Sequence, residues 1–201
     1  MSFQLHMAAE ARLPTRFGEF RILGFEGRAV GGRSDEAVVL RMGEFAPADA
    51  PLVRIHSQCL TGDVFHSLRC DCRAQLEQAL EMIADEGKGI LIYEMQEGRG
   101  IGIMNKLRAY ALQDGGADTV EANLQLGLDV DLRNYELPAA ILRSMGLTRV
   151  RLMSNNPEKI GALESVGITV ERLSAETDAP HSAQDYLRVK KEKLGHLIDG
   201  V

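Results

Sequence analysis

Apolar and polar positions divide the chain into a strand-rich first third and a remainder in which helices and strands alternate. Segments 12–26 and 37–43 carry the β-branched and aromatic residues typical of strands, and the glycine-rich, charged segment 27–36 separates them. Segment 51–57, PLVRIHS, has a similar composition and predicts a further strand. The first third of the chain is therefore predicted to be rich in β-structure.

From Gln75 onward the apolar residues follow the period of a helix. Leu76, Leu80 and Ile83 fall on one helical face, and Gly87 is positioned to end that helix. The alternation of strands and helices that follows predicts an α/β fold with some α+β character, in one domain, 1–201, whose mixed β-sheet is flanked by helices. Strands are predicted over 89–95, 149–154 and 168–173, and helices over 101–113, 134–146, 157–167 and about 183–199.

Composition narrows the class of protein. Hydrophobic residues make up 45% of the chain and charged residues 26%, as in ordinary soluble domains. No apolar run reaches the roughly 18 residues of a membrane span, and the N-terminus lacks a secretory pattern, so we expect a cytoplasmic protein. A net charge of −6 and the absence of tryptophan argue against nucleic-acid binding but leave phosphorylated small molecules open.

All the cysteines lie in one polar segment, RIHSQCLTGDVFHSLRCDCRAQ, at Cys59, Cys70 and Cys72. Three thiols cannot all pair as disulfides, and the arginine, aspartate and glutamine residues around them are unlike an apolar core. Three thiolates with a fourth position open to water are typical of a catalytic zinc ion, which activates that water for hydrolysis. Two alternatives remain: buried thiols without a metal, and a closed structural site completed by His56 or His66.

Two further polar segments follow predicted strands, where ligands of open α/β sheets bind. In 96–100, QEGRG, the glycines let the backbone approach a ligand while Arg99 offers a fork to phosphate. In 154–161, SNNPEKIG, free backbone N–H groups at a helix start and the Lys159 ammonium are suited to an anion. Each segment is also compatible with an ordinary strand-to-helix turn.

Asp131 and Arg133 lie close together in the segment DLRNY. A carboxylate and a guanidinium at this spacing usually form a surface ion pair, but the same turn can offer one group for proton transfer and one for phosphate. Tyr110, in the middle of a predicted amphipathic helix, is expected by default to lie in the core or to be half-buried.

Together these segments resemble the GTP cyclohydrolase II family, which opens the guanine imidazole ring at the start of riboflavin synthesis. The resemblance is carried by the cysteine segment, by QEGRGIGIMNKLRAYALQDGGADTVEAN, by SNNPEKI and by YLRVKKEKLGH. It runs from LPTRFGEF to LGH and so covers nearly the whole chain. It implies a hydrolase acting on a cyclic amidine C–N bond, which converts GTP to 2,5-diamino-6-(5-phosphoribosylamino)pyrimidin-4(3H)-one, formate and pyrophosphate.

The resemblance also implies roles for individual residues. Asp131 corresponds to the family's proton acceptor, Arg133 to its proposed nucleophile and Tyr110 to a catalytic tyrosine. Because arginine stays protonated at any ordinary pH, an electrostatic clamp on phosphate is the milder role for Arg133. The zinc ligands correspond to Cys59, Cys70 and Cys72. The GTP contacts correspond to Arg54, Ile55, His56, Ser57, Gln58, Gln75, Glu97, Gly98, Arg99, Thr119, Ser154 and Lys159.

One Zn²⁺ per subunit, Mg²⁺ on the triphosphate and a cytoplasmic homodimer without nucleic-acid or membrane partners complete what the resemblance implies. The chain departs from the family's pattern at Gln58 (usually Glu), at Arg73 (usually Gly), at Met95 and over 174–184. Arg73 would strain its turn if that position required a positive φ. Two other functions stay open: a specialised or arrested relative that acts on GTP in another pathway, and a non-catalytic, zinc-stabilised nucleotide sensor.

Overall fold

The computed structural model describes residues 3–28, 34–46, 48–129 and 131–177, together with residues 188, 191, 192, 195, 197 and 198. The chain divides into two compact units. The sheet unit comprises 1–56, 77–95 and 134–175, and the thiol unit comprises 57–76, 96–133 and 176–201. The expected helix at about 183–199 lies almost wholly outside the described residues. The expectation of a single domain over 1–201 stays a prediction.

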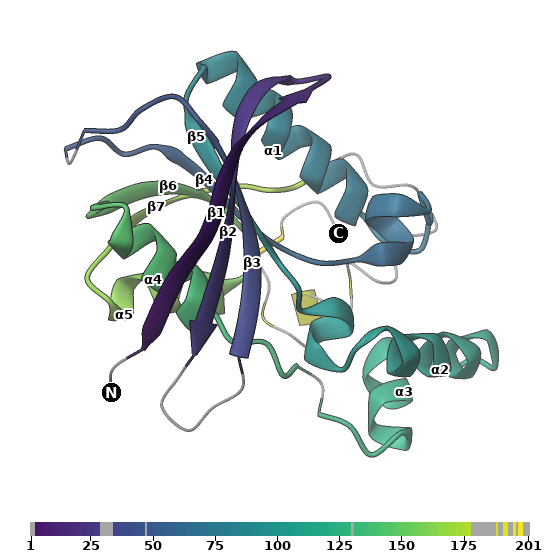
Figure 1. The fold of residues 1–201 in the computed structure, drawn as a ribbon. Coiled ribbons are helices and arrows are strands. Elements are labelled where there is room, and N and C mark those ends of the chain that lie inside the picture. The colour runs from purple at the N-terminus through teal and green to yellow at the C-terminus, as the bar shows by residue number, and fades with distance from the viewer. Residues whose placement is uncertain are drawn as a thin grey trace. The chain divides into compact units, whose positions relative to one another are not determined.

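Among the described residues, the strands form one seven-stranded sheet in the order β1-β2-β3-β5-β4-β6-β7 (Figure 1). Strands β1, β2, β3 and β5 pair antiparallel, whereas β6 is parallel to both β4 and β7. The predicted α/β class with a mixed sheet and a β-rich first third is therefore confirmed. The strands are β1 (Gln4–Thr15), β2 (Gly18–Arg28), β3 (Ser34–Met42), β4 (Leu52–Ser57), β5 (Gly89–Glu94), β6 (Arg149–Met153) and β7 (Thr169–Leu173).

The first predicted strand segment, 12–26, contains a hairpin rather than one strand. Its turn is closed by Thr15, whose Oγ1 accepts from the Phe17 N–H at 3.1 Å and donates to the Gly18 carbonyl at 2.9 Å. Strand β1 begins at Gln4, well before the predicted segment. Most side chains of β1 are exposed, so the apolar alternation that would have revealed the strand is missing.

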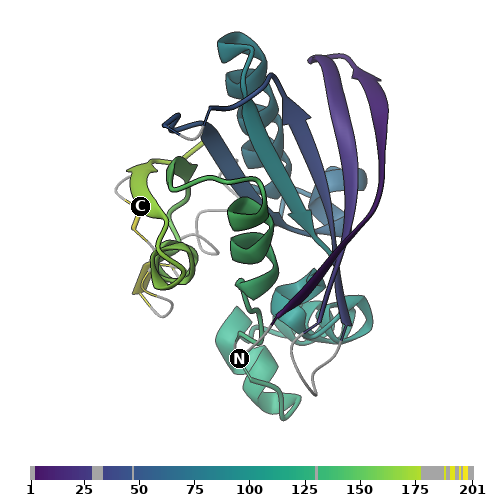
Figure 2. The ribbon, with the colours of Figure 1, turned by 60° about the vertical axis from the view of Figure 1, so that its left-hand side comes forward.

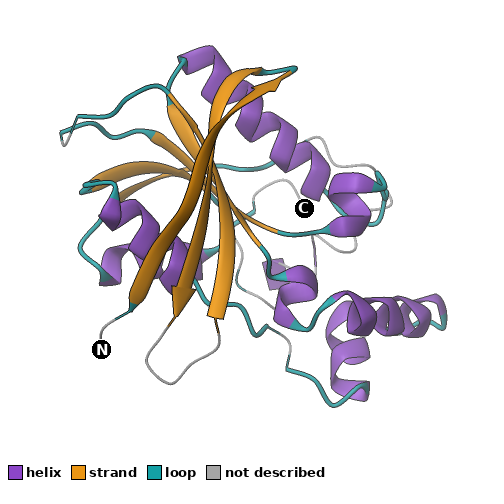
Figure 3. Cartoon of the chain, viewed as in Figure 1, coloured by secondary structure: helices purple, strands orange, loops and turns teal. Residues whose placement is uncertain are grey.

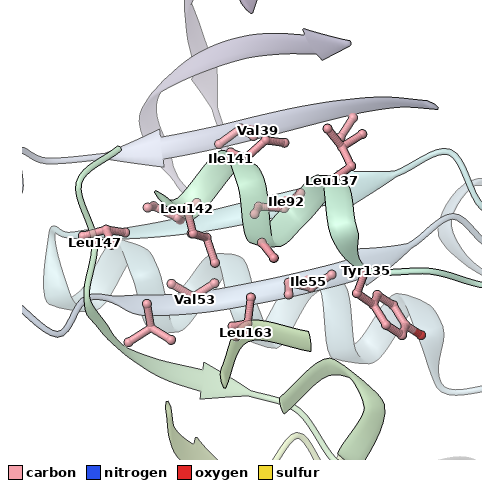
Figure 4. Close-up of a cluster of buried hydrophobic side chains, with 14 of the residues drawn as sticks. Val39, Val53, Ile55, Ile92, Tyr135, Leu137, Ile141, Leu142, Leu147 and Leu163 are labelled. Atoms are coloured by element: carbon pink, nitrogen blue, oxygen red, sulfur yellow. The ribbon is translucent and has the colours of Figure 1, made fainter. Parts of the chain in front are cut away.

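Helices cover both faces of the sheet within the sheet unit (Figures 2 and 3). On one face, α4 (Glu136–Ser144) and α5 (Pro157–Ser165) pack on the main hydrophobic core, shown in Figure 4. Alternate residues of β5, such as Ile92, join this core. On the other face lies α1 (Cys72–Glu86), so close that a Cβ at Gly89 would stand 2.7 Å from Ile83. That contact explains a glycine inside a buried strand.

The predicted helices that fall within the described residues agree with the structure in type and closely in extent. Helix α1 begins at Cys72, before the predicted start at Gln75, because its first turn is polar and carries no apolar signal. In the thiol unit, α2 (Ile103–Asp114) matches the predicted 101–113. The following helix, α3 (Thr119–Gln125), was not predicted. No helix in the described part of the chain is both long enough and apolar enough to cross a bilayer.

Candidate metal centre and pocket

The thiol unit brings its three cysteines together. Their Sγ atoms all lie within 4.8 Å of one another, and those of Cys59 and Cys70 are 3.7 Å apart. Cys59 and Cys70 are buried, and Cys72, the first residue of α1, is partly buried. Sulfur atoms gathered in this way have the spacing that ligands of a single metal ion require.

A single π-helical turn, η1 (Leu60–Val64), folds the chain between the first two thiols. Within it Asp63 accepts a 3.0 Å hydrogen bond from the Cys59 N–H through Oδ2, and its own N–H donates to the Cys59 carbonyl at 2.7 Å. Gly62 leaves room for sulfur, because a Cβ there would lie 2.9 Å from Cys70 Sγ and 3.1 Å from Cys59 Sγ. The turn is thus built around the space between the thiols.

Arg73 stands at the position where glycine is usual in the family that the sequence resembles, and it contacts this turn. It lies in the first turn of α1, and its Nη1 donates to the Asp63 carbonyl at 2.7 Å. Positive φ among the described non-glycine residues is confined to His66 and Arg99. The strain considered for Arg73 is therefore absent, because a helical position does not require a positive φ.

The thiols cannot all ionise without a cation. Hydrogen bonds from Cys70 and Cys72 hold the pKa of Cys59 far below its ordinary value. The hydrogen bond to Cys59, together with burial, raises the pKa of Cys70 to about 11. Contacts with Cys59 and then Cys70 hold the pKa of Cys72 well above its ordinary value. A divalent cation would favour all three thiolates at once, so the donor set fits a thiophilic metal such as zinc.

The histidine alternatives differ in position. His66 is exposed, and the potential metal-binding group found among the described residues consists of the three cysteines alone. A closed site completed by His66 is therefore not supported. His56 belongs to the sheet unit, where its ring stacks on Tyr93 with centroids 5.4 Å apart.

A pocket of about 440 Å³ opens beside the thiols, and all of its lining residues belong to the thiol unit. This volume is in the range of small-molecule sites. The pocket brings together ten of the residues predicted from the sequence. They are Ser57, Gln58, Cys59, Cys70, Cys72, Glu97, Gly98, Arg99, Tyr110 and Arg133.

The turn η2 (Glu97–Gly100) presents arginine to the pocket through unusual backbone angles. Gly98 and Arg99 both lie in the left-handed region, with φ of 61° and 59°. That conformation is free for glycine but costs an arginine about 1 kcal/mol, a strain typical of functional sites. The Arg99 carbonyl accepts a 2.9 Å hydrogen bond from the Leu132 N–H, which ties the turn to the segment that carries Arg133.

Arg133 is held by the neighbouring carboxylate. Its Nε lies 2.9 Å from Asp131 Oδ1, and its Nη2 donates to Oδ2 of the same side chain. Burial tends to raise the pKa of Asp131, but the hydrogen bond and charge of Arg133 outweigh burial and keep that pKa below its ordinary value. Arg133 lines the pocket, whereas Asp131 is not among its lining residues. The pair is partly buried and fixes the guanidinium in place.

Tyr110 is half-buried and faces the pocket. Its hydroxyl is 3.2 Å from Thr61 Oγ1, which in turn lies 3.7 Å from Cys59 Sγ. The Arg69 guanidinium stands over its ring at 4.7 Å from the centroid. Burial raises the pKa of Tyr110 above its ordinary value, so the phenol stays protonated at neutral pH and can donate a hydrogen bond.

Five predicted substrate contacts form a second group, in the sheet unit. Arg54 Nη1 donates to the Met153 carbonyl at 2.8 Å, and Lys159 Nζ donates to the Ile55 carbonyl at 2.8 Å. Both cations are buried, and they donate to backbone carbonyls of the parallel strands β6 and β4. The group consists of Arg54, Ile55, His56, Ser154 and Lys159.

Two predicted contacts fall in neither group. Gln75, in the first turns of α1, donates to Asp71 through Nε2. Thr119 is the first residue of α3, and its side chain lies outside the described part of the structure.

Lys106, Gln113 and Asn123 are among the pocket residues that were not predicted from the sequence. Lys106 and Gln113 share with Tyr110 one face of α2, since residues spaced by three or four positions are neighbours on a helix. Asn123 is buried in α3. The spacing around Tyr110 is the signal that could have found the first two.

The comparisons with known proteins agree on one family. Residues 6–174 match the family described as GTP cyclohydrolase II. A GTP cyclohydrolase-2 from Pseudomonas aeruginosa is 52% identical over 191 residues, which cover 94% of this chain and 92% of that protein. One from Haemophilus influenzae is 48% identical over 197 residues, 97% of this chain and 90% of that protein.

Two longer relatives match as well. The riboflavin biosynthesis protein RibBA of Aquifex aeolicus is 53% identical over 192 residues, which cover 94% of this chain and 47% of that protein. The RibBA of Salinispora tropica is 50% identical over 197 residues, covering 97% of this chain and 48% of that protein. The chain therefore spans about half the length of these two relatives.

Proposed function

The chain belongs to the GTP cyclohydrolase II family, and we propose that it acts as a hydrolase on GTP, releasing formate and pyrophosphate and leaving 2,5-diamino-6-(5-phosphoribosylamino)pyrimidin-4(3H)-one. This is the reaction that opens riboflavin synthesis. The observation that carries the proposal is the pocket in which three clustered thiols, three arginines and a tyrosine meet.

We assign the metal to Cys59, Cys70 and Cys72, whose donor set and spacing fit zinc. When bound, zinc supplies a Lewis acid that activates water at neutral pH. The chain's own contribution is to hold the ligands through the turn η1, with Gly62 leaving space between sulfur atoms. The substrate's C8, the carbon lost as formate, would then be bound at the thiol end of the pocket.

Arg99 and Arg133 are suited to the triphosphate. Both line the pocket, and a guanidinium offers paired donors that match phosphate oxygens. Mg²⁺ on the triphosphate would offset the remaining negative charge. Since Arg133 is locked against an ionised Asp131, it stays protonated, which supports a role as an electrostatic clamp over one as a nucleophile.

Tyr110 is the pocket's proton donor in this proposal. Its phenol is protonated at neutral pH and hydrogen-bonded to Thr61, beside the thiols. From there it can orient water or donate to a purine nitrogen as the imidazole ring opens. The cytoplasmic location and the homodimeric state that the resemblance implies belong to the same proposal.

The test uses the full chain with GTP and Mg²⁺, and measures formate and pyrophosphate with and without a chelator. We expect both products, and loss of formate once zinc is removed. Pyrophosphate without formate would point to an arrested relative, and binding without either product to a nucleotide sensor. Cys70→Ser, which keeps the side-chain size, is expected to lose zinc and formate release together; formate release at the parent rate would contradict the metal assignment.

A further inference from the structure

Lys106 occupies the space between the thiols and the arginine-bearing turn. Its Nζ lies 3.2 Å from Cys59 Sγ and 2.7 Å from Glu97 Oε1. The side chains of Lys106 and Glu97 are only 12% and 8% exposed. One ammonium group therefore joins a thiol of the metal site to a buried carboxylate.

Glu97 connects Lys106 to the backbone through two hydrogen bonds. Its Oε2 accepts a 2.7 Å hydrogen bond from the Leu60 N–H, and its Oε1 accepts a 2.9 Å hydrogen bond from the Gly98 N–H. Leu60 opens the turn that follows Cys59, and Gly98 belongs to the left-handed turn that presents Arg99. The carboxylate thus fixes the start of both turns, and Lys106 fixes the carboxylate.

The charges require such a cation. With a divalent ion bound, three thiolates would outweigh its charge by one, and Glu97 would add another negative charge within the same buried region. An uncompensated buried charge is strongly destabilising, and a hydrogen bond to a charged partner is stronger than a neutral one. Among the described residues that line the pocket, Lys106 is the lysine that meets both groups.

We propose that Lys106 is a positioning residue that couples the metal centre to the nucleotide-binding turn, by holding the Cys59 thiolate and the Glu97 carboxylate in one arrangement. These contacts run from the Cys59 thiol through Lys106 and Glu97 to the Gly98 N–H, so a metal ion held by Cys59 would act on the nucleotide-binding turn through them. The inference rests on the zinc and GTP assignments of the proposed function. It adds a residue and a direction of coupling that those assignments do not contain.

The experiment compares the full chain with Lys106→Met, which keeps most of the length but removes the charge, and with Lys106→Arg, which keeps both charge and donors. Lys88→Met is the matched control, because Lys88 pairs with Asp49 in the sheet unit. Zinc affinity is measured by competition with a chromogenic chelator. Affinity for a non-hydrolysable GTP analogue is measured with and without zinc.

We expect Lys106→Met to weaken zinc binding about 10- to 100-fold, as loss of an outer-shell partner does. Lys106→Arg should retain most of the affinity, and Lys88→Met all of it. In the parent, zinc removal should weaken analogue binding by about 5- to 150-fold, the usual range of coupling between sites. In Lys106→Met that factor should fall close to one.

Parent-like zinc affinity in Lys106→Met overturns the proposal, even if turnover is lost, since Lys106 would then act on substrate directly. An unchanged zinc effect on analogue binding overturns the coupling. If circular dichroism shows that Lys106→Met is unfolded, Lys106→Gln, which keeps a donor without the charge, enters the same titrations. If no protein, the parent included, binds the analogue, the proposed function fails, and the zinc titration still decides the role of Lys106 at the metal centre.

Discussion

Gly62 shows how a single missing methyl group shapes the metal centre. A Cβ at this position would lie 2.9 Å from Cys70 Sγ and 3.1 Å from Cys59 Sγ, closer than atoms normally approach. We expect Gly62→Ala to destabilise the fold by about 1–3 kcal/mol through overpacking and to lower zinc affinity. Chemical denaturation and chelator competition measure the two effects.

Gly161 supplies the control for that substitution. It lies inside α5, where an added Cβ meets nothing within 4 Å. Gly161→Ala should therefore stabilise the protein by about 0.5–1 kcal/mol, because alanine favours the helix over glycine. If Gly62→Ala stabilised the protein as Gly161→Ala does, a methyl group would fit beside the thiols, and the close packing of the metal centre would be refuted.

Site residues that lie close together in the chain could be predicted, whereas those that meet across a long sequence separation could not. The cysteines share one short segment, so their clustering together with its polar residues indicated a metal. Lys106 meets Cys59 across 47 positions, and no local pattern records a contact of that length. The left-handed φ of Arg99 was likewise hidden, although the glycines on either side indicated a tight turn.

Among the elements, α3 is the one whose sequence signal was overlooked. Asp118 accepts from the N–H groups of Val120 and Glu121, at 2.7 and 3.0 Å, and Glu121 accepts in return from the Asp118 N–H at 3.0 Å. This capping box was visible as D-x-x-E, but the helix is short and its Leu124 is 62% exposed, so no apolar face accompanied it. Long helices with a buried face, such as α1, are predictable from the helical period of their apolar residues.

We expect Asp118→Ala to destabilise the protein by about 1 kcal/mol, because two N–H groups at the start of α3 lose their acceptor. Asp118→Asn, which keeps an acceptor oxygen, is the control and should lose much less. Denaturation gives the free energy of unfolding, and hydrogen exchange over 119–125 locates the effect. Equal stability of the alanine and asparagine variants would show that the cap contributes nothing.

At the scale of the whole molecule, the sequence indicated most of the elements but not how the strands neighbour one another. The order places β5 between β3 and β4, although β4 precedes β5 in the chain. Such pairing depends on contacts distant in sequence, which local periodicity does not encode. The division into a sheet unit and a thiol unit, each made of separate stretches of the chain, was hidden for the same reason.

That division predicts that zinc stabilises the chain unevenly. A ligand at about 1,000 times its Kd stabilises the state that binds it by about 4 kcal/mol, and the three cysteines belong to the thiol unit. Chelation should therefore speed amide exchange over 59–73 and 97–110, while 34–42 and 89–94, whose strands pair within the sheet, keep their protection. Hydrogen-exchange mass spectrometry of the same sample before and after chelation gives the comparison, with Cys70→Ser as a zinc-free reference. Equal loss of protection in the sheet peptides would mean that the two units open as one, and unchanged exchange over 59–73 would mean that no metal holds this segment.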